Sequence, residues 1–180
     1  MEFQLKAISK QGIAEAFSKV TLYRSLNEPE EAESICHDIL AIEPENQMAQ
    51  RLLGLAITDQ FTGQVSDRYA EAEALFESLA DSYERHYYKG LLYERRAKAQ
   101  MHAGRPAQVL VPLFKQAMLH FEEAEKMRPP DNDDSILRWN RCVRLLHNLP
   151  DVQAEPEESS FEDHDLAPVQ IIRGTSRAAG

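Results

Sequence analysis

The stretch "EAESICHDILAIEPENQMAQRLLGLA", residues 31–56, decides the fold class. Ile35, Ile39 and Ile42 recur at three- and four-residue intervals, which is the spacing of one helix face. After Pro44 a second, leucine-rich helical pattern follows, and it contains Gly54 although glycine costs a helix about 1 kcal/mol relative to alanine. Helices joined by so short a connection pack as antiparallel neighbours. The stretch therefore predicts an antiparallel helix pair whose second helix contains an unexplained glycine.

One residue spacing from this stretch recurs further along the chain. A small residue is followed after four positions by a large residue, after three more by an apolar residue and after five more by a proline. The pattern occurs three times, and its second occurrence lacks the proline. The three sets are Ala32, Cys36, Ile39 and Pro44; Ala72, Phe76 and Leu79; and Ala117, Phe121, Ala124 and Pro129. This spacing resembles the second helix of the tetratricopeptide repeat, whose period is about 34 residues. In that family a small residue stands at the position of Gly54, ten residues after Pro44, because a Cβ there would push the paired helices apart. The resemblance covers roughly residues 12–147.

The resemblance implies an all-α fold, a right-handed superhelix of antiparallel helix pairs with about seven helices. Three degenerate repeats would be followed by a polar capping helix that contains Trp139. The third repeat is longer than the pattern, so that either Gly90 or Ala97 could be its small residue. The apolar periodicity and the Gly and Pro breakers place the helices at residues 4–26, 29–42, 45–61, 67–81, 84–103, 106–127 and 132–148. Asn27 and Asp81 are predicted N-caps.

The chain is expected to divide into a helical domain, residues 1–149, and a tail, residues 150–180. Residues 151–165 hold seven acidic side chains and no Lys or Arg, a composition typical of disordered segments. One hypothesis is that this acidic stretch folds back on the basic segment Arg85–Arg105. The other is that it remains solvated.

Composition limits the class of partner. The chain of 180 residues has a formal net charge of −10. Binding to nucleic acid or to an anionic membrane surface requires a basic face, so neither partner is expected. The two cysteines form no disulfide framework, and the N-terminus shows no apolar signal segment. We therefore expect a cytoplasmic protein.

Catalytic and metal-binding patterns are weak. Cys36, His37 and Asp38 are adjacent, but neighbouring residues on a helix point about 100° apart, so these side chains cannot converge. Cys36 is also a core position of the repeat. The sequence holds no Gly-rich phosphate loop, and we expect no enzyme activity, no cofactor and no metal site.

The expected function is that of an adaptor for another protein. In tetratricopeptide proteins the first helices of successive pairs line a groove that binds a peptide or helix. The resemblance implies that this lining includes Arg24, Arg51, Leu55, Tyr87, Leu91, Arg95, Asn140 and Arg144. An acidic partner is one option, because residues 83–105 concentrate tyrosines and basic side chains in an acidic protein.

The alternative is a structural subunit that forms homo-oligomers through its long helices. The segment "VLVPLF", Val109–Phe114, distinguishes the two functions. Its exposure would favour self-association, and its burial would favour the groove.

Overall fold

The computed structural model describes residues 3–149, and this part of the chain forms seven α-helices and no strand. The helices are α1 (Ile13–Ser25), α2 (Pro29–Ile42), α3 (Gln47–Asp59), α4 (Tyr69–Glu77), α5 (Ser82–His102), α6 (Ala107–Lys126) and α7 (Asp134–His147), and a 3-10 turn, η1 (Lys10–Gly12), precedes them. The predicted all-α class is confirmed. The predicted tail, residues 150–180, lies outside the described residues, and so does its proposed docking on α5.

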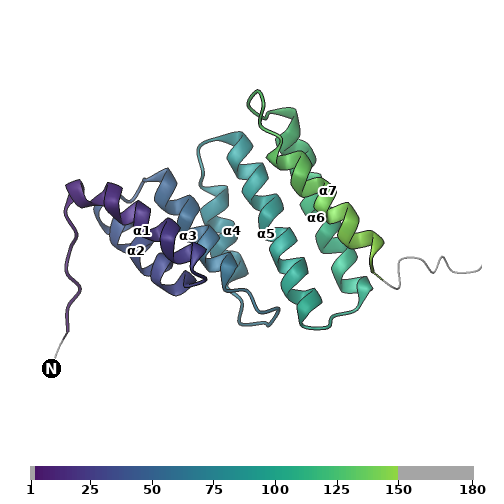
Figure 1. Ribbon diagram of the computed structural model, residues 1–180, viewed down its shortest axis with the longest axis horizontal. Coiled ribbons are helices and arrows are strands. Elements are labelled where there is room, and N and C mark those ends of the chain that lie inside the picture. The colour runs from purple at the N-terminus through teal and green to yellow at the C-terminus, as the bar shows by residue number, and fades with distance from the viewer. Residues whose placement is uncertain (1–2, 150–180) are drawn as a thin grey trace, which may run out of the picture.

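The helices follow one another from α1 and α2 at one end to α6 and α7 at the other (Figure 1). Each helix packs on the next in sequence, and each odd-numbered helix also contacts the next odd-numbered one: α1 with α3, α3 with α5 and α5 with α7. The stronger helix contacts in residues 3–149 include none between two even-numbered helices. The fold is therefore a stack of helix pairs with the odd-numbered helices closer together along one face.

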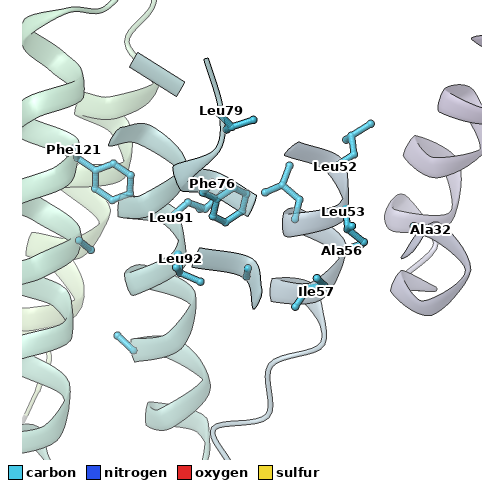
Figure 2. Packing of buried hydrophobic residues seen from close by; sticks show 14 of the residues in the cluster. Ala32, Leu52, Leu53, Ala56, Ile57, Phe76, Leu79, Leu91, Leu92 and Phe121 are labelled. Carbon is cyan, nitrogen blue, oxygen red and sulfur yellow. The ribbon is translucent and has the colours of Figure 1, made fainter. Parts of the chain in front are cut away.

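Two glycines explain how closely the helix pairs approach. A Cβ added at Gly54 of α3 would lie 2.5 Å from Cε1 of Phe76 on α4. A Cβ at Gly90 of α5 would lie 2.6 Å from the same atom of Phe121 on α6. Figure 2 shows the two phenylalanine rings among the buried side chains. Ala97 is also buried, but it is Gly90 that stands against Phe121 as Gly54 stands against Phe76, which resolves the register of the third pair.

The small residues of the repeated spacing all lie in the core. Ala32, Ala72 and Ala117 are 0% exposed, and the large residues four positions on, Cys36 and the two phenylalanines, are 0% exposed as well. Both the small and the large positions of the repeated spacing are therefore buried, as the spacing predicts.

The predicted start of the first helix at residue 4 is wrong. Helix α1 begins at Ile13, and residues 3–9 are not helical. Phe3 and Leu5 are 87% and 96% exposed, and in residues 3–9 only Ile8 is partly buried against the core. A short segment with so little packing lacks the main source of helix stability in water. The ends of the other six helices lie within four residues of the prediction.

The predicted caps had mixed outcomes. The Asp81 side chain accepts a hydrogen bond from the Glu84 backbone N–H at 2.8 Å and caps α5, as predicted. Asn27 is not an N-cap, because Glu28 holds that position before α2. Asn27 instead has a φ of 61°, a left-handed conformation that asparagine tolerates in a tight turn.

The segment Val109–Phe114 lies inside α6 and is exposed on one side only. Leu110 and Phe114 are 2% and 0% exposed, whereas Val109 is 43% exposed. The segment therefore contributes both to the core and to the outer surface. No helix in residues 3–149 combines the length and the apolar character that crossing a membrane would require.

Candidate partner-binding face

The eight predicted groove residues all lie on odd-numbered helices. Helix α1 carries Arg24, α3 carries Arg51 and Leu55, α5 carries Tyr87, Leu91 and Arg95, and α7 carries Asn140 and Arg144. The odd-numbered helices contact one another along the stack and form one side of it. We call this side the odd-helix face.

Asp59 at the end of α3 joins three helices of this face. Its carboxylate accepts a hydrogen bond from Arg24 Nε of α1 at 2.7 Å and lies 2.5 Å from Arg95 Nη1 of α5. Arg95 also donates to the backbone carbonyl of Leu55 at 3.0 Å and to the hydroxyl of Thr58. Burial lowers the pKa of Arg95, and the nearby Asp59 carboxylate opposes that effect. One carboxylate thus holds two guanidinium groups in place.

A second ion pair joins α3 to α5. Arg51 donates to the carboxylate of Glu84 on the next odd-numbered helix. Its guanidinium carbon also lies 5.9 Å from the centroid of the Tyr88 ring, within the range of a cation–π contact. Both side chains of the ion pair are 27% exposed, so the pair remains accessible from solvent.

A third cluster surrounds Glu94, whose side chain is 0% exposed. Its Oε1 lies 2.8 Å from Lys98 Nζ and 3.5 Å from Arg138 Nη1 of α7. Its Oε2 has no hydrogen-bond partner within the described residues. A buried carboxylate is costly unless it is paired. Lys98 pairs with Glu94 from the same helix, and Arg138 is the cation that links α7 to α5.

The apolar members of the predicted groove contribute less surface. Leu55 and Leu91 are 8% and 4% exposed and belong to the core. Tyr87 is half-buried, with its ring stacked on Tyr83 at 5.7 Å between centroids. On α7, Asn140 is half-buried and Arg144 is exposed. The accessible part of the face is therefore mainly charged.

The charges on this face differ in sign from those of the whole chain. The three clusters contain five cations, Arg24, Arg51, Arg95, Lys98 and Arg138, and three carboxylates, Asp59, Glu84 and Glu94. The exposed Arg144 adds a further cation. A protein with a formal net charge of −10 thus has an excess of cations here.

Sequence reasoning missed the acidic members of these clusters and also Arg138 and Lys98. The sequence did contain a signal for these ion pairs. Arg24 and Asp59 are 35 residues apart and Arg51 and Glu84 are 33 apart, which is close to the predicted repeat period of about 34 residues. Equivalent positions of successive repeats lie side by side, so opposite charges at that spacing predict ion pairs.

The adjacent Cys36, His37 and Asp38 do not form a site. Cys36 is 0% exposed, and burial raises the pKa of its thiol to about 12. The His37 side chain is 54% exposed and faces Glu33 one turn away. Among residues 3–149, no group of three or more His, Cys, Asp or Glu side chains is placed to hold a metal ion.

Comparison of the chain with protein-family models, with curated proteins and with solved structures finds no match. The functional argument therefore depends on the geometry of the face itself.

Proposed function

We propose that this protein is a non-catalytic adaptor of the tetratricopeptide type, which binds an acidic peptide segment of a partner protein on its odd-helix face. The observation that carries the proposal is the convergence of Arg24 and Arg95 on the single carboxylate of Asp59. Two guanidinium groups fixed around one carboxylate form a site that can also receive a carboxylate from outside, because arginine binds carboxylates through several N–H donors at once.

Two further observations support an adaptor. Side-chain contacts at sequence separations of 33 to 37 residues recur along the stack, as expected for a degenerate repeat of about 34 residues. The excess of cations on one face of an acidic chain would attract an acidic segment and repel a basic one. In this proposal Asp59 and Glu84 hold the arginines until a partner's carboxylates share or replace those contacts.

The test uses fluorescently labelled peptides of equal length that are acidic, neutral or basic. Fluorescence anisotropy should detect binding of the acidic peptide, and binding should weaken as salt screens the charges. Arg24→Ala and Arg95→Ala should each lower the affinity about tenfold or more. Lys115→Ala removes the same charge from the exposed surface of α6 and should have little effect.

Two results would refute the proposal. One is equal affinity for the acidic and neutral peptides. The other is a loss in Lys115→Ala as large as that in the arginine variants. Circular dichroism of each variant establishes that the helical fold is retained.

A second candidate function, self-assembly, is favoured by the outer surface of α6. Val109 and Leu119 are 43% and 55% exposed there, and a shallow hollow beside Leu119 is lined by Met118 and Trp139. Light scattering over a concentration series should show dimers or larger species if this surface assembles. Leu119→Glu should then return the protein to a monomer, and a wild-type protein that is monomeric at high concentration excludes this function.

A further inference from the structure

The hollow on the outer side of α6 and α7 has a composition that could pair with a copy of itself. These two helices form one end of the stack (Figure 1). Four lining residues come from α6 and one from α7: Lys115, Met118, Leu119, Glu122 and Trp139. Leu119 is 55% exposed, and Met118 and Trp139 are half-buried. The α6 side of the hollow is therefore apolar in the middle, with a cation on one side and a carboxylate on the other.

The order of these residues along α6 is symmetric. Lys115 precedes Met118 by three positions, and Glu122 follows Leu119 by three. The intervals of three and four residues bring all four side chains to neighbouring positions on the helix surface. A two-fold axis through the midpoint between Met118 and Leu119 sets two α6 helices antiparallel and places Lys115 opposite Glu122. The same axis places Met118 opposite Leu119, so each position meets a complementary one.

We propose that this surface is a two-fold interface between two copies of the chain, in which the α6 helices pack antiparallel. The proposal rests on the second candidate function, self-assembly, and specifies its partner and its geometry. Leu119 of each copy packs on Met118 and Trp139 of the other. Two Lys115–Glu122 contacts flank this apolar centre. Because a two-fold interface uses the same patch on both copies, assembly stops at the dimer.

The two charged residues are available for such contacts. Lys115 and Glu122 are both exposed, and neither forms an ion pair within residues 3–149. The neighbouring charges Glu123 and Lys126, by contrast, already pair with each other at 2.6 Å. Exposed ion pairs add little affinity, so the proposed contacts select the antiparallel orientation. The affinity itself comes from covering Leu119 and Trp139.

The first measurement follows the full 180-residue chain by light scattering over a concentration series. We expect an equilibrium between monomer and dimer without larger species. Trp139 is the single tryptophan of the chain, so intrinsic fluorescence reports on the hollow directly. Its emission should move to shorter wavelength over the same concentration range, because the partner copy shields the ring from water.

Charge reversal tests the geometry. Lys115→Glu and Glu122→Lys each place like charges at both symmetric contacts and should weaken the dimer at least tenfold. An equal mixture of these two variants should dimerise again, because every contact in the mixed dimer joins opposite charges. Glu31→Lys makes the same charge change on an exposed residue of α2, at the other end of the stack, and should dimerise as the wild type does.

The outcomes separate this pairing from self-assembly in general. A wild-type protein that stays monomeric overturns both and leaves the hollow to a different occupant. A dimer that both reversals leave unchanged, or that the mixture does not restore, overturns the pairing alone. If a variant misfolds, as circular dichroism would show, the wild type still decides, because dimerisation without a change in Trp139 emission also overturns the pairing. Acidic-peptide binding is a separate measurement, since none of these residues belongs to the charge clusters of the odd-helix face.

Discussion

Replacing Gly54 by alanine gives the sharpest test of how the helix pairs pack. The added Cβ would lie 2.5 Å from Cε1 and 2.8 Å from Cζ of Phe76, whereas ordinary van der Waals contact begins at 3.4 Å. The ring would have to move by about 0.9 Å to reach that distance. Phe76 is 0% exposed and stacks on Tyr88 at 5.5 Å, so there is little free space into which it can move.

Two opposing effects set the expected magnitude. Helix propensity alone favours alanine over glycine by about 1 kcal/mol. Overpacking a filled core costs about 1–3 kcal/mol and in some cases more, and here the clash is with a ring held on both sides. Because the overlap is severe, we expect the clash to exceed the propensity gain. The net result should be a loss of about 1–2 kcal/mol of unfolding free energy, or about 3–6 °C in Tm for a domain of this size.

Urea unfolding followed by circular dichroism measures this difference. Gly12→Ala is the control, because its Cβ would meet only the flexible Ser9 hydroxyl at 3.3 Å, and its stability should stay within about 0.5 kcal/mol of the wild type. Phe76→Leu removes the ring that the new Cβ would meet. The double variant Gly54→Ala with Phe76→Leu should therefore lose about 1 kcal/mol less unfolding free energy than the sum of the losses in the two single variants. A Gly54→Ala protein that is more stable than the wild type would refute the reasoning.

Three further predictions follow from other contacts. Gly90→Ala should destabilise the fold to a similar extent, since its Cβ would lie 2.6 Å from Phe121, and thermal unfolding checks this. The Arg68 guanidinium, bonded to the Glu33 carboxylate at 2.7 and 2.5 Å, lowers the pKa of that carboxyl to about 2 from 4.5. A lowered folded-state pKa adds stability that is full above pH 4.5 and lost as the pH falls toward 2. Glu33→Gln should therefore cost about 1–2 kcal/mol at pH 7 in urea unfolding and much less near pH 2, and an equal cost at both pH values would contradict this. Burial raises the pKa of the Cys36 and Cys142 thiols to about 12, so iodoacetamide at pH 8 should alkylate both only after unfolding, as mass spectrometry can show.

Local patterns predicted most of the helices because the signals act over a few residues. Apolar periodicity located the seven helices, and Asp81 signalled the start of α5 through a contact with Glu84 only three residues away. The prediction failed for the residues before Ile13, where Phe3 and Leu5 are exposed and only Ile8 is partly buried against the core. Propensity and pattern describe what a segment could do, and only packing decides whether it does so.

The sequence predicted the arginines of the candidate site but not the carboxylates that pair with them. Arg24, Arg51 and Arg95 were identified from the repeat register alone. Asp59 was not, because its role depends on α1 and α5 both lying against the end of α3. Leu55 and Leu91 were expected to line the groove, but the tight packing of the stack leaves them in the core.

The sequence by itself determined the class of fold, since helical spacing, prolines and paired small and large residues leave few ways to bury the apolar surface. The family resemblance also indicated that a Cβ at Gly54 would push the paired helices apart. Only the tertiary structure decided that Gly90 rather than Ala97 faces Phe121, and that Asp59 finds its partners across helices. The physical reason is the distance along the chain over which each kind of signal acts. Periodicity records which side of a helix is buried, but contacts between residues 31 to 37 positions apart depend on how far each helix slides along its neighbour, and side-chain packing sets that distance.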